Sequence, residues 1–308
     1  MPADALGPGI PAQRVDDNPG TDEPRDIPWV VAVVSDGSAP GGEDHDVATD
    51  SLGVLLEDDA AGIHVRAGIP VWAAPLPKRH VKDLVAHVLG LPGDTGAIFL
   101  THTDPDRARH VQRKVREAGG PPVLTDADTI TVTLTAALLT TLAAARCEPD
   151  ASRVIIAGAA SLPELAPLLI ATGIGDIGSW NASDAHAFPL HSLARHATAV
   201  IDLLGATTQA AGWVPGDNSS SVISSDDPTY RLLPAPGLFA ALTHHPEATL
   251  DLDVFRACAL ALAVATPLGH LVPDLDDPHL TQAIASPVLR VLARRPSSRS
   301  PGPPHTTT

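Results

Sequence analysis

Residues 153–181, RVIIAGAASLPELAPLLIATGIGDIGSWN, contain the pattern that decides the fold. Arg153–Ala157 is a short apolar run rich in β-branched residues, which predicts a buried strand. Pro163 opens a helix that ends at Gly173, and Asp176–Trp180 predicts a second strand. A strand, a helix and a second strand within this length are typical of one half of a dinucleotide-binding domain.

The loop after the first of these strands is the candidate cofactor site. A dinucleotide fingerprint needs one glycine for the tight turn, a second where the backbone approaches the pyrophosphate, and a third for close packing of the helix. The three positions are Gly158, Ala160 and Pro163, and Asn181 stands where an acidic residue would hold a ribose hydroxyl. A structural turn without a ligand is the alternative. The candidate contacts for NAD or NADP are Gly158, Ala159, Ala160, Ser161 and Asn181.

The same alternation extends on both sides of this unit, although the stretch after Ser38 is polar and acidic and has no assigned element. Asp104 and Pro105 supply the cap and the first residue of a basic helix. The sequence therefore predicts an α/β fold with a mostly parallel sheet and helices on both faces. The other predicted elements are strands at Trp29–Val34, Ala97–Leu100, Ala199–Leu204 and Val222–Ser224, and helices at His80–Gly90, Thr131–Arg146, Leu252–Ala265 and Pro278–Ala293.

The chain divides into two predicted domains and two flanks. We expect a Rossmann-like, doubly wound parallel sheet domain over residues 125–295, preceded by a smaller, truncated α/β domain over residues 27–124. Residues 1–26 are rich in Pro, Gly and Asp, and residues 296–308 are rich in Pro, Ser and Thr. Neither segment has hydrophobic periodicity, so both are predicted to be disordered.

Composition excludes several classes of function. The chain of 308 residues is 44% hydrophobic and has 20 basic and 36 acidic residues, which give a net charge of −16. This charge argues against a nucleic-acid partner, because phosphate contacts need Lys and Arg. No uninterrupted apolar run of membrane-spanning length and no signal peptide are found, so we expect a cytoplasmic protein. The two cysteines, Cys147 and Cys258, are predicted to be buried small side chains.

Five segments in the same order resemble the malic enzymes, specifically the short bacterial type. The resemblance covers residues 29–293 and implies a malic-enzyme-like fold with an NAD(P)-binding domain. It also implies an oligomer, so we expect a homo-oligomer or a partner chain. The five segments are Val33–Ala39, Ala67–Val71, Pro122–Asp126, Arg153–Gly173 and Pro236–Leu242.

The residues that this family uses for catalysis are largely replaced. The resemblance implies oxidation of malate with a divalent metal, a lysine and a tyrosine, but the lysine segment aligns with Gly53–Asp58 and the tyrosine has no counterpart. The two metal carboxylates align with Thr101 and His102, and a third aligns with Ala127. Asp126 is the one surviving catalytic position, and an N-cap for the following helix is its alternative role. One carboxylate is too few for Mg²⁺ or Mn²⁺, so a metal is not expected.

The substrate-binding asparagines of the family are replaced as well. They align with Asp227 and with the pair Tyr230 and Arg231. The sequence therefore favours a catalytically inactive relative, which would bind a dinucleotide, a small metabolite or a partner chain. The alternative is an active NAD(P)-dependent malic enzyme or related oxidoreductase that uses substituted residues.

Overall fold

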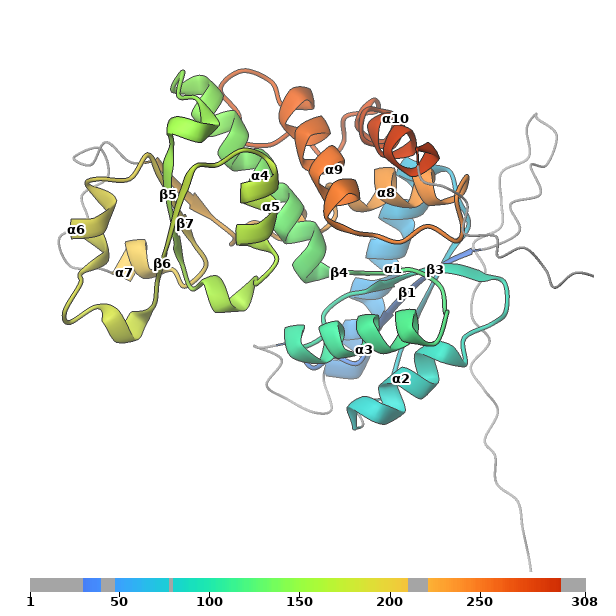
Figure 1. Ribbon diagram of the computed structural model, residues 1–308. Coiled ribbons are helices and arrows are strands. Elements are labelled where there is room, and N and C mark those ends of the chain that lie inside the picture. Colours follow the sequence, from blue (N-terminus) through green and yellow to red (C-terminus); the bar gives the residue numbers. More distant parts are fainter. Residues whose placement is uncertain (1–29, 40–47, 78–79, 210–220, 295–308) are drawn as a thin grey trace, which may run out of the picture.

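The fold contains two four-stranded sheets, and every described strand pair is parallel (Figure 1). The structure is a computed structural model that describes residues 30–39, 48–77, 80–209 and 221–294. The predictions for residues 1–26 and 296–308 lie outside these ranges. Within them, strands alternate with helices along the chain, so the α/β fold expected from the sequence is confirmed.

The first sheet has the strand order β2-β1-β3-β4. Its strands are β1 Val30–Ser35, β2 Val71–Pro75, β3 Thr95–Leu100 and β4 Val123–Thr125. Alternate residues of β1 face opposite sides, because side chains in a strand alternate. Ala32 and Val34 pack under α2 (Val81–Leu89) and α3 (Pro105–Glu117), whereas Val31 and Val33 belong to the larger core on the other face. Both faces of the sheet are therefore buried, as parallel sheets require.

The second sheet repeats this order as β6-β5-β7-β8. The strands are β5 Arg153–Ala157, β6 Asp176–Trp180, β7 Ala199–Asp202 and β8 Ser221–Ser224. Three short helices, α5 Leu165–Ala171, α6 Leu190–Ala194 and α7 Ala206–Gln209, connect them. The predicted strands at 153–157 and 176–180 are confirmed. Single-turn helices are η1 Pro149–Ala151, η2 Ala159–Ser161, η3 Ala182–Asp184 and η4 Pro228–Arg231.

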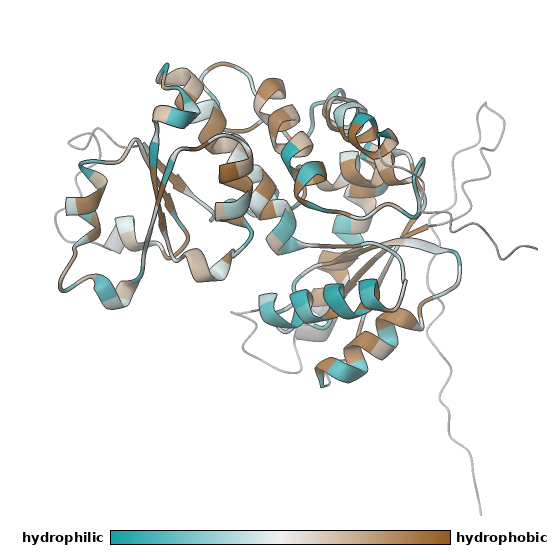
Figure 2. Ribbon diagram, in the orientation of Figure 1, coloured by the Kyte–Doolittle hydropathy of each residue, from teal (hydrophilic) through white to brown (hydrophobic). Residues whose placement is uncertain are grey.

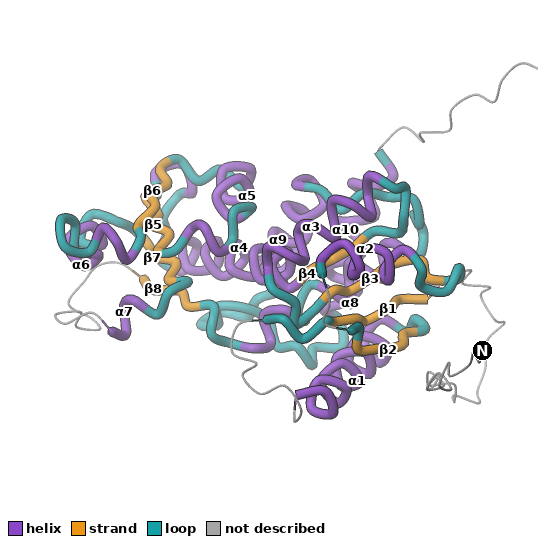
Figure 3. The backbone as a smooth tube through the Cα atoms, turned by 90° about the horizontal axis from the view of Figure 1, so that it is seen from below, coloured by secondary structure: helices purple, strands orange, loops and turns teal. Residues whose placement is uncertain are grey.

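Helix α4, Asp126–Ala144, leads from the first sheet to the second (Figure 3). It is the one helix in the described ranges that is long and apolar enough to cross a membrane, but 61% of its apolar window is buried inside the protein. Two of its threonine hydroxyls are satisfied within the helix, since Thr135 and Thr141 donate to the carbonyls of Thr131 and Ala137. These bonds let a polar side chain lie in an apolar core, which identifies α4 as a core helix.

The C-terminal helices return to the first sheet. They are α8 Ala235–Leu242, α9 Leu252–Ala265 and α10 Leu280–Ala293. Helix α8 packs on α1 (Ala48–Ala67), and α10 packs on both α8 and α9. Phe239 of α8 meets Phe99 of β3 edge to face, with ring centres 6.1 Å apart. Residues from the end of the chain therefore complete the core of the first sheet.

Several elements differ from the sequence expectations. Helix α1 occupies the stretch read as polar and acidic; Leu56 and Ile63 are buried on one face, whereas Val54, Leu55 and Val65 are exposed, so apolar and polar residues are mixed around the helix, as its colouring in Figure 2 indicates. Helix α4 begins at residue 126, five residues earlier than expected. Cys258 is buried as predicted, whereas Cys147 is exposed, which corrects the expectation for that side chain.

The close approach of α8 and α10 gives a test of this packing. A Cβ at Gly237 would lie 2.5 Å from Cβ of Ile284, so we expect Gly237→Ala to destabilise the fold by about 1–2 kcal/mol despite its better helix propensity. Gly53→Ala in α1 is the matched control, because a Cβ there meets nothing within 4 Å. Urea unfolding should show the control unchanged or slightly stabilised; equal stabilisation of both variants would contradict the packing.

Candidate functional site

A cluster of polar side chains lies at the carboxyl ends of β3 and β4. Thr101 and His102 follow β3, and Asp126 is the first residue of α4 directly after β4. The two strands are parallel neighbours, so their carboxyl ends meet at one edge of the sheet. The Asp126 carboxylate accepts hydrogen bonds from Thr101 Oγ1, at 2.8 Å, and from the backbone amide of His102, at 2.7 Å. Asp126, the position that the resemblance predicts to be retained, thus contacts the two residues that it predicts to align with metal ligands.

Asp126 is not the helix cap that the sequence suggested. The N-cap of α4 is Thr125, whose hydroxyl accepts from the amide of Asp128, while the Asp128 carboxylate accepts from the amide of Thr125. This reciprocal capping box satisfies the first turn of the helix. Asp126 is therefore free to face the residues after β3, and its buried carboxylate belongs to the polar cluster.

Two residues distant in sequence complete the cluster. Arg231 of η4 donates to Oδ2 of Asp59 in α1, and Arg231 Nη1 lies 3.5 Å from Thr101 Oγ1. The side chains of Asp59 and Arg231 are only 3% and 16% exposed, so this ion pair is nearly excluded from water. A guanidinium thus stands beside the residues aligned with metal ligands. Asp59, Thr101, His102, Asp126 and Arg231 are called the Arg231 cluster below.

His102 has the most constrained geometry of the cluster. Its φ of 48° lies in the left-handed region, which is unfavourable for a side chain other than glycine. The conformation is held because the His102 carbonyl accepts from Ser35 Oγ, at 3.0 Å, and from the amide of Ala39. Its buried Nε2 lies 3.4 Å from Asp59 Oδ2 and makes no hydrogen bond.

Hydrogen bonds fix the position of η4 and therefore of Arg231. Asp227 caps η4 by accepting from the amide and hydroxyl of Thr229. Thr133, at the end of the second turn of α4, donates to the carbonyl of Tyr230 at 2.9 Å. The same helix therefore places Asp126 at its start and holds Arg231 through its second turn.

The two carboxylates of the cluster have opposite electrostatic surroundings. Burial raises the pKa of Asp126, and the hydrogen bonds from Thr101 and His102 only partly oppose it. Burial also acts to raise the pKa of Asp59, but contact with His102 and Arg231 outweighs it and lowers that pKa below its usual value. Asp59 is therefore the charged partner of Arg231, whereas Asp126 favours its protonated form more strongly than a surface carboxylate.

The cluster does not fit a divalent cation. Mg²⁺ and Mn²⁺ need several oxygen ligands, but both oxygens of Asp126 accept hydrogen bonds and Asp59 is paired with a guanidinium. Arg231 would also repel a nearby metal ion. Within the ranges that the structure describes, no group of three His, Cys, Asp or Glu side chains is arranged to hold a metal.

The candidate cofactor loop lies at the equivalent edge of the second sheet. Gly158 has φ of 87°, and its amide donates to the carbonyl of Trp180 at 2.8 Å. A Cβ at this position would lie 2.7 Å from Cγ of Leu204, so the Leu204 side chain covers the loop at Gly158. Leu204 is held there because buried Asp202 accepts hydrogen bonds from the amides of Leu204 and Thr207.

The other predicted cofactor contacts lie in this loop and directly after β6. Ala159 is half-buried, and Ala160 and Ser161 are exposed in η2, but α5 begins only at Leu165, after Glu164 at its N-cap. The negative charge of the Glu164 carboxylate would repel an anion near the start of the helix. Asn181 is exposed after β6, where its backbone amide donates to Asp184 Oδ2.

Asp59 is the functional-site residue that sequence reasoning missed. It lies on α1, which was not predicted, and its burial depends on Arg231, 172 positions away. One local signal was available, because Leu56, Asp59, Ala60 and Ile63 recur at the spacing of one helix face and all are buried.

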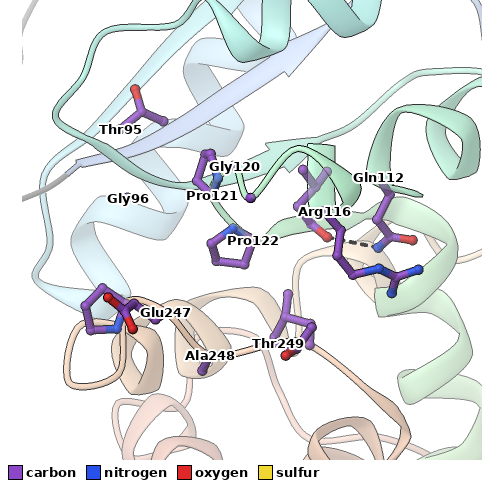
Figure 4. A pocket seen from close by; sticks show the side chains of 14 residues that line it. Thr95, Gly96, Gln112, Arg116, Gly120, Pro121, Pro122, Glu247, Ala248 and Thr249 are labelled. Carbon is purple, nitrogen blue, oxygen red and sulfur yellow. Dashed lines mark hydrogen bonds between the residues drawn. The ribbon is translucent and has the colours of Figure 1, made fainter. Parts of the chain in front are cut away.

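A cavity of about 530 Å³ lies away from both candidate sites (Figure 4). It borders Thr95 at the start of β3 and Pro122 before β4, and residues 246–250 form the opposite wall. These are the amino ends of the strands, whereas ligands of α/β sheets bind at the carboxyl ends. The charged side chains of this cavity, Arg116 and Glu247, are exposed. The Arg231 cluster and the Gly158 loop are therefore the better candidates.

Solved structures show which fold this is. The NAD-dependent malic enzyme of Thermotoga maritima matches with a TM-score of 0.69 and 16% identity, covering 85% of both chains. Malic enzymes of Pyrococcus horikoshii and Entamoeba histolytica match at the same TM-score and identity, covering 87% of this chain and 77% and 70% of theirs. No protein-family model and no curated protein matches the chain. The chain has a malic-enzyme-like fold with a Rossmann-like domain.

The buried ion pair predicts non-additive mutational effects. We expect Asp59→Asn and Arg231→Met each to destabilise the protein by about 2–4 kcal/mol, because each leaves its partner buried and unpaired. The double variant should lose at least about 1 kcal/mol less than the sum of the two. Denaturant unfolding of the four proteins measures this coupling, and additive losses would show that the pair contributes nothing.

Asp128 predicts a specific pH dependence of stability. Burial raises its pKa from 3.8 to about 6, so the stability that its protonated form contributes is complete below pH 4 and is lost as pH rises through 6. This difference in pKa corresponds to about 3 kcal/mol. The stability of the wild type relative to Asp128→Asn should therefore fall by up to that amount between about pH 4 and pH 7. Parallel stability curves for the two proteins would contradict it.

Proposed function

We propose that this chain is a catalytically inactive protein with a malic-enzyme-like fold, and that it acts by binding a nucleotide or a partner chain. The pairing of Arg231 with Asp59 carries this proposal. Metal-dependent oxidation of malate requires a hard cation beside the substrate, and the chain has a buried guanidinium there instead. We further propose that the protein functions in the cytoplasm, in keeping with the burial of α4, the one long apolar helix among the described residues.

Proton-transfer groups are also unsuited to that reaction. Tyr230, the one tyrosine of the chain, is buried in η4, and burial raises its pKa. Of the three lysines, Lys78 lies outside the described residues, and Lys82 and Lys114 lie on α2 and α3, on the face of the first sheet opposite α1. Asp227 adds an exposed carboxylate before η4, which would repel a dicarboxylate substrate. The tyrosine, these two lysines and Asp227 are thus each unsuited to the oxidation of malate.

The proposed nucleotide site is a weakened one. A pyrophosphate approaches closest where the second fingerprint position lacks a side chain, and Ala160 has a methyl group there. The Leu204 side chain against Gly158 and the carboxylate of Glu164 make the loop more apolar and more acidic. We therefore infer that NAD or NADP binds weakly, without the metal-dependent chemistry.

An active NAD(P)-dependent oxidoreductase with substituted residues is the second candidate. The left-handed Gly158 between β5 and α5 keeps the tight turn of a dinucleotide-binding unit, which both candidates require. Asp126 would be its one retained catalytic group. The two candidates differ in a single measurable property, which is turnover of malate.

Malate oxidation tests the leading proposal. We expect the purified protein with malate, Mn²⁺ and either NAD or NADP to reduce no dinucleotide above the rate without malate, because the metal ligands are replaced. Asp126→Ala is the control for a trace activity. A malate-dependent rate that Asp126→Ala removes would establish the second candidate instead.

Calorimetric titration tests the nucleotide site. We expect NAD and NADP to bind the wild type no more tightly than about 1 mM, and Leu204→Ala to bind roughly tenfold more tightly because the loop is uncovered. Leu55→Ala is the matched control, since Leu55 on α1 is 44% exposed and Leu204 is 40% exposed. Affinity that Leu204→Ala leaves unchanged would show that Leu204 does not restrict the loop.

A further inference from the structure

The cavity at the amino ends of β3 and β4 has two walls from distant parts of the chain (Figure 4). One wall is the end of α3 with the loop from Gly119 to Pro122, and the other is the segment from Pro246 to Leu250 between α8 and α9. The volume of about 530 Å³ lies within the range of sites that hold small ligands. The proposed function uses none of the residues that line this cavity.

The loop that forms the first wall is rigid before any ligand binds. Gly119 has φ of 69° and follows the end of α3 in the left-handed conformation. A Cβ at Gly120 would lie 2.7 Å from Cγ1 of Val115, so the loop is packed closely against α3. Pro121 and Pro122 then fix the next two φ angles. A wall of this kind loses little conformational entropy when a ligand binds.

Two opposite charges lie at opposite ends of the cavity. Figure 4 shows Arg116 of α3 at one end and Glu247 at the other, with Pro122 and Ala248 between them. Both charged side chains are exposed, and neither forms an ion pair with another residue in the part of the chain that the structure describes. Leu250 adds a further apolar residue to the lining. The cavity therefore has a cationic end, an apolar middle and an anionic end.

Gln112 lies one helical turn before Arg116 and can only accept hydrogen bonds from a ligand. Its Nε2 donates to the carbonyl of Val123, at 2.9 Å, and to Oδ2 of Asp128, at 2.8 Å. These two bonds use both hydrogens of the side-chain amide, which leaves Oε1 to accept. The end of α3 thus offers a ligand one cation and one acceptor.

This pattern selects a class of ligand by its charges. Arg116 attracts a carboxylate and would repel a polyamine, whereas Glu247 attracts an ammonium group and would repel a nucleotide or a dicarboxylate. A free amino acid has both charges on one carbon atom, so it cannot reach both ends of the cavity. A short peptide has its amine and its carboxylate at opposite ends, N–H groups that Gln112 can accept, and side chains for the apolar middle.

We propose that this cavity binds a short peptide with free termini, whose carboxylate pairs with Arg116 and whose ammonium group pairs with Glu247. The inference is independent of the proposed function, because both candidate sites lie at the carboxyl ends of the strands. Ion pairs between exposed side chains contribute modest free energy. We therefore expect a dissociation constant of about 0.1 mM.

Calorimetric titration of the full chain with trialanine, trivaline and trileucine tests the site. We expect at least one of these peptides to bind, and Arg116→Gln and Glu247→Gln each to weaken it roughly fivefold. Both side chains are exposed, so the variants should fold like the wild type, which thermal unfolding checks. Arg113→Gln on α3 and Glu57→Gln on α1 are the matched controls and should leave the affinity unchanged, because neither residue lines the cavity.

Capped peptides assign each charge of the ligand to its partner. The amidated form of the bound peptide should bind the wild type roughly fivefold more weakly, and Arg116→Gln should weaken it no further. The acetylated form should show the same behaviour with Glu247→Gln. An acetylated peptide that binds as tightly as the free one would show that the cavity holds the carboxyl terminus of a longer chain, which would overturn the requirement for two free termini.

Two further outcomes would overturn the proposal as a whole. One is that none of the three peptides binds at about 5 mM. The other is binding that neither Arg116→Gln nor Glu247→Gln weakens, since the peptide would then lie at another site. Neither outcome depends on whether malate or a dinucleotide binds, so failure here and failure of the proposed function are distinguishable.

Discussion

Burial of α4 between the two halves of the molecule is the constraint on which the structure depends. The helix begins directly after β4, ends before β5 and packs against α5, α9 and η4. Thr135 and Thr141 donate to carbonyls one turn back, which satisfies their hydroxyls in an apolar core. Because Asp126 starts this helix and Thr133 bonds to η4, its position also determines the geometry of the Arg231 cluster.

The two sheets share one strand order, and their topological switch points are both occupied by residues of the chain. In each sheet the switch lies between the first and third strands, where α/β proteins bind ligands. At the first, Ser35 bonds to the carbonyl of a left-handed His102. At the second, Leu204 lies against Gly158. At each switch point, a side chain of the protein thus contacts the backbone at the carboxyl edge of the sheet.

Local patterns predicted much of the fold. The strand at 153–157 and the helix at 252–265 have the expected bounds, because an apolar run and a helical period depend on neighbours in sequence. The N-cap of α3 at Asp104 was also predicted from neighbouring residues and is confirmed. Helix α1 was missed because its buried face is narrow and includes Asp59.

The composition of the Arg231 cluster was less accessible from sequence. The family resemblance identified Thr101 and His102 as the predicted replacements of metal ligands, and Arg231 as that of a substrate-binding asparagine. Their mutual arrangement depends on the ion pair to Asp59, which joins α1 to η4 across 172 positions. Thr125 caps the helix in place of Asp126, because the Asp126 carboxylate accepts hydrogen bonds from residues after β3.

The return of the C-terminal helices to the first sheet has a consequence for biosynthesis. On the ribosome, α1 emerges long before α8, which covers it, and α10 packs on α8 so closely that Gly237 admits no side chain. The apolar face of the first sheet therefore stays uncovered until α8 has been synthesised, whereas the strands from 153 to 224 can pair as soon as they emerge. A nascent chain therefore exposes this apolar face until α8, α9 and α10 have emerged and can pack on it.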